Sequence, residues 1–125
     1  MAIPGSSDGQ EVLRNGAILT QSTDTTSFKW DGTSPTTGTE SVTVPTNHII
    51  TILSIIWCET GNAAEIFNLY GVNGAYILKK QDLAARATFI WNERLVLKGG
   101  QFLKTWLESS ADIDVFYSYL DQDWS

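Results

Sequence analysis

The residue types that most often carry catalysis are scarce in this chain. His48 is the only histidine and Cys58 the only cysteine among 125 residues. A nucleophilic triad would rest entirely on His48, and a zinc site built from several histidines and cysteines is excluded. His48 opens a long apolar run, where a hydrogen-bonded residue at a strand start is the usual outcome. Cys58 ends that run and is expected to be a small buried hydrophobe, with no internal disulfide.

Carboxylates are more numerous, but their spacing does not define a site. Asp112 and Asp114 are placed on one strand face, and Asp121 and Asp123 repeat the spacing. Calcium binding needs several oxygens from one locality, and no Asp-x-Asp-x-Asp-Gly loop accompanies these pairs. A glycosidase pair would have to come from Glu65, Glu93 and Glu108, whose separations the sequence does not set. We therefore predict a protein that is not an enzyme and binds no metal or cofactor.

Aromatic residues offer a second kind of chemistry, which is stacking. The chain has five tryptophans, Trp30, Trp57, Trp91, Trp106 and Trp124. Exposed tryptophan can stack on sugars, as in carbohydrate-binding β-sandwiches, but large aromatics also fill cores and subunit interfaces, where they are enriched. The second interpretation is favoured. Trp124, at the acidic end of the chain, has no evident core position and is predicted to dock on a neighbour.

Charge and size narrow the class of protein. A net charge of -6 and a pI of about 4.5 argue against nucleic acid and against an anionic membrane surface as partners. No secretion signal is visible at the N-terminus, which predicts synthesis in the host cytoplasm. The length predicts one domain, residues 11–125. It follows a flexible arm, residues 1–10, rich in Pro, Gly and Ser and free to lie over a neighbouring molecule.

Alternating apolar residues and turn signals predict an all-β fold. Residues 86–120 are typical of a meander, with a hairpin at Gly99-Gly100. Asn73-Gly74 marks a second hairpin, and Asn15-Gly16 a tight turn or bulge. Only residues 79–87 favour a helical turn. Turn signals about every 8–12 residues predict a single β-sandwich, jelly-roll-like, of about eight antiparallel strands.

The strongest predicted strand covers residues 49–58, which are dense in β-branched side chains. Both faces of this strand are apolar. A strand with two dry faces predicts that the outer one is covered by a loop, by the arm or by another subunit. Strict alternation places four apolar residues on one face, and with the terminal tryptophan they form the candidate interface: Ile49, Leu53, Ile55, Trp57 and Trp124.

Four stretches carry a likeness to a known class: residues 40–45, 49–56, 89–101 and 111–120. Over residues 41–120 the chain resembles small β-sandwich virion structural proteins of tailed bacteriophages, most closely the decoration (cement) proteins of capsids. The resemblance implies a non-enzymatic homotrimer on the capsid surface of the virion. Such a trimer binds between major capsid proteins and stabilises the shell.

Two other functions fit the same residues. The fold pattern is shared by tail and head–tail joining components, which are present in few copies per virion. A carbohydrate-binding β-sandwich module would instead use exposed Trp and Tyr side chains.

Overall fold

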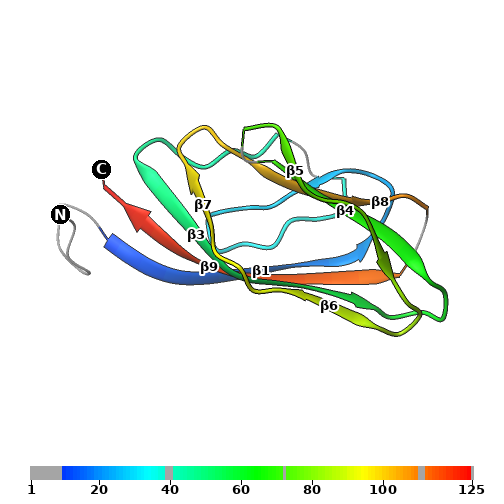
Figure 1. Cartoon of the computed structure of the whole chain (residues 1–125). Helices are drawn as coiled ribbons and strands as arrows, with labels where there is room; N and C mark the ends of the chain where they lie inside the picture. The colour runs from blue at the N-terminus through cyan, green and yellow to red at the C-terminus, as the bar shows by residue number, and fades with distance from the viewer. Residues whose placement is uncertain (1–9, 39–40, 72, 110–111, 125) are drawn as a thin grey trace.

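The computed structural model describes residues 10–38, 41–71, 73–109 and 112–124, and within them the chain forms nine strands and no helix (Figure 1). The strands are β1 (Gln10–Gln21), β2 (Thr26–Ser27), β3 (His48–Glu59), β4 (Glu65–Gly71), β5 (Ala75–Leu83), β6 (Thr88–Trp91), β7 (Leu95–Lys98), β8 (Leu103–Leu107) and β9 (Ile113–Asp123). Of the expected arm, residues 1–9 lie outside the described residues, and Gln10 is the first residue of β1.

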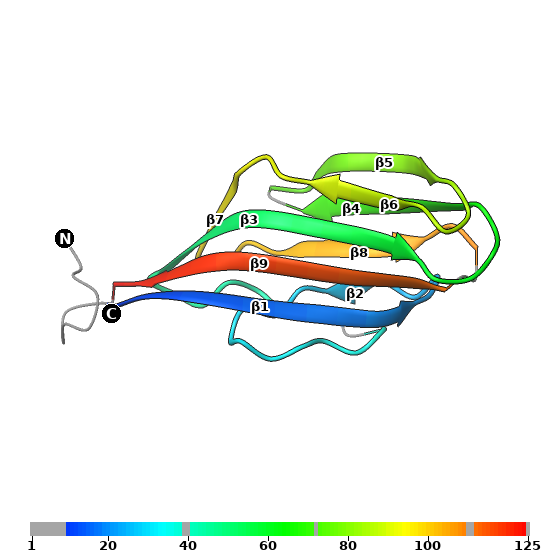
Figure 2. The same cartoon turned by 90° about the horizontal axis from the view of Figure 1, so that it is seen from below.

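The strands form two antiparallel sheets that pack against each other. The wide sheet has the order β1-β9-β3-β6, with β7 also paired to β3, and the narrow sheet has the order β2-β8-β4-β5. Figure 2 shows β1, β9, β3 and β6 side by side in one layer, with β8, β4 and β5 in the other. The predicted β-sandwich is confirmed.

The pairing is that of a jelly roll. Strands β6 and β7 pair with successive halves of β3 and count as one strand. The antiparallel pairs β1–β9, β2–β8, β3–β6/β7 and β4–β5 are then the rungs of one long hairpin with its tip between β4 and β5. Contacts of β9 with β3 and of β8 with β4 wind this hairpin into two sheets. Eight strands in this order make a jelly roll, as the sequence predicted.

The predicted meander over residues 86–120 is wrong. Gln101 N donates to Lys98 O at 3.0 Å, so a turn does form at Gly99-Gly100, but only Gly100 has a positive φ, of 87°. Two-residue hairpins need a positive φ at the first central residue. This turn therefore leads from β7 in the wide sheet to β8 in the narrow one. At Asn73-Gly74 both residues have a positive φ, and the predicted hairpin there joins β4 to β5.

Two other local predictions fail for reasons of packing. Strand β1 runs straight through Asn15-Gly16, because Gly16 lies against a core ring: a Cβ there would sit 2.5 Å from Tyr117 Oη. The missing Cβ of Gly16 leaves space for the Tyr117 side chain, and the glycine does not form a turn. The helical turn expected over residues 79–87 is replaced by the second half of β5, which pairs with β4 and buries Leu83 in the core.

The core lies between the two sheets and is rich in aromatic rings. Trp57 stacks on Phe67 with ring centroids 4.5 Å apart, and Phe28 meets Tyr117 edge-on at 4.6 Å. Trp30 is 2% exposed, so two of the five tryptophans, Trp30 and Trp57, are core residues, in line with the favoured interpretation. Such rings bury large apolar areas and account for much of a small domain's stability.

Candidate functional site

A bulge in β3 decides which side chains of the strongest strand face outward. The register with β9 shifts between Ile52 and Ser54, which adds one residue and reverses the alternation beyond it. Ile55 and Trp57 consequently share the inner face with Ile52, and all three are fully buried. Strict alternation had predicted the opposite face for them.

The candidate interface predicted from sequence is therefore divided by the structure. Ile55 and Trp57 are core residues, so the expectation that they share an outer face with Ile49 and Leu53 is wrong. Ile49 and Leu53 are half-buried. Trp124 follows β9, donates its backbone N–H to Asn47 O at 2.9 Å and has a 37% exposed side chain.

The outer side of the wide sheet carries two apolar rows. Strand register aligns Ala17, Phe116, Ile56 and Ile90 across β1, β9, β3 and β6. A second row runs across β1, β9, β3 and β7 and consists of Leu13, Leu120, Thr51 and Val96. We call these eight residues the apolar face. Four of them are strongly exposed, Leu13 (73%), Ile90 (58%), Val96 (51%) and Phe116 (44%).

Charged side chains stand at the two ends of the apolar face and, with the exposed Glu93 and Arg94, at its β6–β7 edge. The row beyond Leu13 contains Glu11 and Lys98, and the row beyond Phe116 contains Asp114. Between the two apolar rows lie the uncharged Asn15, Ser118 and Ser54. A charge-free apolar centre with a polar rim is typical of a protein interface.

Part of one edge of the wide sheet is covered by the chain itself. Ser34 Oγ accepts from Ala17 N at 3.0 Å, and Thr37 Oγ1 accepts from Ser22 N at 3.3 Å. These hydroxyls satisfy one backbone donor within β1 and one just after it, and a cleft of about 450 Å³ lies between Leu19 and Pro35. Covering an edge in this way prevents another strand from adding to it.

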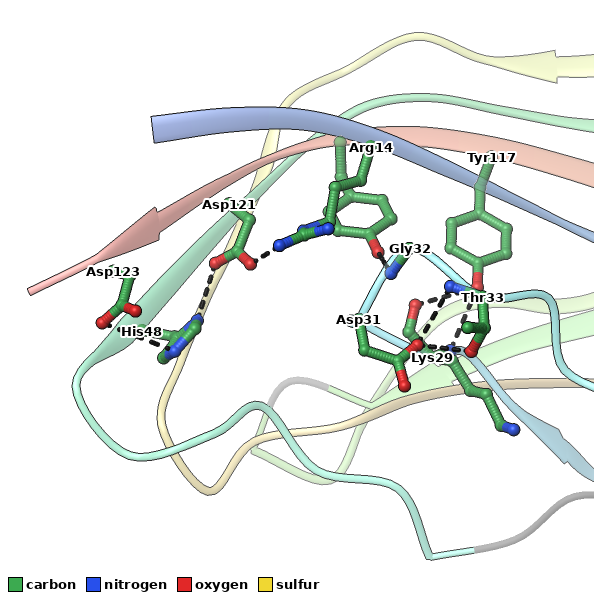
Figure 3. Close-up of polar contacts among 10 residues, drawn as sticks. Arg14, Lys29, Asp31, Gly32, Thr33, His48, Tyr117, Asp121 and Asp123 are labelled. Carbon is green, nitrogen blue, oxygen red and sulfur yellow. Dashed lines mark hydrogen bonds and ion pairs between the residues drawn. The ribbon is translucent and has the colours of Figure 1, made fainter. Parts of the chain in front are cut away.

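A polar network connects β1, β3 and β9 at the end of the wide sheet where β3 begins and β9 ends (Figure 3). The buried Asp121 contacts His48 Nδ1 at 2.7 Å through Oδ1 and accepts from Arg14 Nε at 3.2 Å through Oδ2. The second ring nitrogen, His48 Nε2, lies 3.6 Å from Asp123 Oδ1. It faces a carboxylate rather than a hydroxyl or thiol, so the geometry is that of a structural ion-pair network. Asp121 and Asp123 belong to β9.

The same end of the core holds the chain segment after β2 in place. Tyr117 Oη accepts from Lys29 N at 3.0 Å and donates to Lys29 O at 2.9 Å, and Tyr119 Oη accepts from Gly32 N at 3.1 Å (Figure 3). Burial raises the pKa of Tyr117 above its usual value. Hydrogen bonds from Thr33 lower the pKa of Asp31. These residues position a loop, and Lys29 and Asp31 also line the cleft beside Trp30.

Three carboxylates gather at the far end of the sandwich. Glu59 accepts from Arg86 N and Gly61 N, each at 2.9 Å. Burial, and then the charges of Glu59 and Asp112, raise the pKa of Glu65. Even so, the described residues contain no group of three or more His, Cys, Asp or Glu that could hold a metal ion.

The glutamates considered for glycoside hydrolysis lie apart from the clefts. Glu108 accepts from Asn68 Nδ2 at 2.7 Å, and Glu93 is exposed between β6 and β7. The cleft of about 240 Å³ beside Trp30 and the larger one beside Leu19 are lined by neither of them, nor by Glu65.

The outer side of the narrow sheet carries four aromatic rings, which we call the aromatic face: Tyr70, Tyr76, Phe102 and Trp106. The Tyr70 ring lies 4.9 Å from Tyr76, 5.9 Å from Phe102 and 6.0 Å from Trp106. Two lysines cover the rings: Lys79 Nζ lies 5.2 Å from the centre of Tyr76, and Lys104 Nζ 4.8 Å from that of Phe102. Sequence reasoning named Trp106 but missed Tyr70 and Tyr76, because only strand pairing places these tyrosines beside Trp106.

The described part of the chain contains no helix that is long and apolar enough to cross a membrane. Comparisons with protein-family models, curated proteins and solved structures found nothing that matches this chain.

Proposed function

We propose that this chain is a non-enzymatic structural protein of a bacteriophage virion. It acts as a capsid decoration (cement) protein that binds between major capsid proteins as a trimer and stabilises the shell. The observation that carries the proposal is the apolar face, an exposed and uncharged surface on the outer side of the wide sheet. Exposed apolar patches that are rimmed by polar residues mark sites of protein–protein interaction.

The size of the apolar face supports a stable contact. Four strands about 4.8 Å apart, with side-chain rows about 6.8 Å apart, give the face and its charged ends a footprint of roughly 600 Å². A standard interface buries about 800 Å² on each partner. The flanking exposed Leu19 and half-buried Ile49 and Leu53 extend the footprint towards that value.

The covered edge of β1 favours a closed assembly. An open sheet edge would let copies add strand to strand without limit, but Ser34 and Thr37 occupy the backbone donors of Ala17 and Ser22. At this part of the edge, contacts through side chains on the sheet face are then favoured over strand addition. In a closed ring the same patch is buried once per copy, and each capsid site repeats the gain.

The test combines oligomeric state with shell binding. Mass photometry of the purified chain should give one species of three times 13.8 kDa at micromolar concentration. The trimer should co-sediment with purified shells that lack a decoration protein and should raise the temperature at which those shells open. A monomer that neither sediments with shells nor stabilises them would overturn the proposal.

The apolar face would serve a tail or head–tail joining component equally well, so copy number has to be measured. A decoration protein is present at every equivalent capsid site, and a joining component in only a few copies. Densitometry of a stained gel of whole virions, relative to the major capsid protein, distinguishes the two. A ratio near one or one-third would favour the capsid.

A further inference from the structure

We propose that the aromatic face is a binding site for a short acidic sugar, a pyranose chain that carries carboxylates. The site lies on the narrow sheet, on the opposite side of the sandwich from the apolar face. It adds a recognition function that the proposed structural role does not require.

In the part of the chain that the structure describes, two lysines at this site have no acidic partner, although the molecule as a whole is acidic. The chain has 14 acidic and 8 basic residues, yet within the described residues neither Lys79 nor Lys104 forms an ion pair. Each ammonium group instead lies over an aromatic ring, at 5.2 Å from Tyr76 and 4.8 Å from Phe102. A cation held over a ring and left without a carboxylate is available to an anionic ligand.

The rings favour a sugar over other anions. Tyr76 is 46% exposed and meets the Trp106 ring at 5.9 Å and 68°, so the two present an apolar, angled surface beside the ammonium groups. The C–H face of a pyranose can pack on such a surface while its carboxylate reaches a lysine. A peptide of acidic residues would use the lysines and leave the rings uncovered.

The surface is also held by hydrogen bonds on its own side of the sheet, since Asn68 pairs with Trp106 and shares its face. The buried Asn68 lies between β5 and β8 and uses both ends of its amide: Nδ2 donates to Glu108 at 2.7 Å, and Oδ1 accepts from Lys80 N at 2.8 Å. These bonds fix the two strands that carry Tyr76 and Trp106. Ligand surfaces held by such secondary contacts lose little freedom on binding.

The net charge of -6 limits the length of the ligand. A long polyanion would extend beyond the two lysines to the acidic remainder of the surface, where like charges repel it within a Debye length of about 8 Å. A chain of a few sugars stays on the aromatic face. The site therefore fits a short acidic oligosaccharide better than nucleic acid.

Saturation-transfer NMR on the full chain tests the proposal with three tetramers. Tetragalacturonate should receive saturation and bind with a measurable Kd, while the neutral maltotetraose and the non-sugar tetraglutamate should each bind at least tenfold more weakly. The double variant Lys79→Gln/Lys104→Gln should weaken tetragalacturonate binding at least tenfold. Lys98→Gln, on the end of the apolar face, is the matched control and should leave it unchanged.

Three results would overturn the proposal. They are no transfer to tetragalacturonate at millimolar concentration, equal binding of tetraglutamate, or equal binding by the double lysine variant. The lysines are surface groups, so the variant's amide NMR spectrum should match that of the parent chain. Tyr76→Ser, which removes a ring and leaves both charges, gives an independent second variant and should also weaken binding. Oligomeric state is not part of this readout, so failure here leaves the structural role untouched.

Discussion

The two outer faces of this sandwich carry different types of side chain. The wide sheet presents mainly aliphatic side chains, with one aromatic ring, Phe116, and no charge in either row. The narrow sheet presents rings in mutual contact, two of them under lysines. Both sheets contribute their inner faces to one core, so neither outer face is needed to fold it. A broad uncharged face suits a large protein partner, and a compact aromatic face with cations suits a small anionic ligand.

The largest effect is expected from charging the apolar face. The double variant Ile90→Lys/Phe116→Lys should raise the dissociation constant of the proposed trimer at least 100-fold, because a buried unpaired charge costs several kcal/mol. Both residues are exposed in the single chain, at 58% and 44%, so the fold should survive. Mass photometry measures the change. Tyr76→Lys, a comparable substitution on the aromatic face, should leave the oligomer intact. Loss of assembly in both variants would contradict the proposal that the apolar face alone mediates assembly.

A second prediction contrasts the two sides of the wide sheet. Gly16→Ala places a Cβ 2.5 Å from Tyr117 Oη and should destabilise the chain by about 1–3 kcal/mol through overpacking. Its neighbour Asn15 faces outward, and Asn15→Ala should change stability by less than about 0.5 kcal/mol. Urea unfolding followed by tryptophan fluorescence measures both. Similar values for the two variants would contradict the tight contact between β1 and the core ring.

The third prediction concerns pH at the end of the narrow sheet. The folded state raises the pKa of Glu65 above 4.5, so the fold favours its protonated form and loses stability as the pH rises through the folded pKa. Glu65→Gln should therefore raise the Tm at pH 7, with the gain shrinking towards pH 4. Thermal unfolding at several pH values checks this. The exposed Glu93→Gln should show no such pH-dependent gain, and equal behaviour of the two would count against burial as the cause.

The smallest expected effects come from salt, and they have opposite signs on the two faces. Raising NaCl from 50 to 300 mM should strengthen trimer formation a few-fold, because it screens the repulsion between copies that each carry a charge of -6. The same change should weaken tetragalacturonate binding a few-fold. Mass photometry and NMR titration across the salt series measure the two trends. Parallel trends would show that one mechanism governs both faces.

Local patterns were sufficient for the fold class but not for the connections between sheets. Alternation located β3 and β9, and Asn73-Gly74 located a hairpin whose turn chemistry is unambiguous. Gly99-Gly100 has similar composition, yet its backbone takes a turn that does not return the strand on itself. Which sheet the following strand joins depends on tertiary packing, and a dipeptide carries no information about that.

The candidate sites were harder to predict, because the register between paired strands brings their residues together from distant parts of the sequence. The single extra residue near Leu53 moves Ile55 and Trp57 from the predicted surface to the core. The apolar face joins residues as distant as Leu13 and Leu120, and neither has a distinctive local pattern. Likewise, Tyr70 and Tyr76 can be recognised as parts of a site only when strand pairing has placed them beside Trp106. A bulge and a strand order had to be known before either face could be recognised.

The wound hairpin also sets an order of events on the ribosome. Gln10 pairs with Asp123, so β1 is synthesised long before its partner strand. The hairpin tip at Asn73-Gly74 can close early, since β4 and β5 are adjacent in the chain. Half of the apolar face, with Leu13 and Ala17, must wait in an unpaired strand until β9 emerges, and pairings this distant fold slowly. The surface proposed to bind the shell is thus assembled only after β9 has emerged.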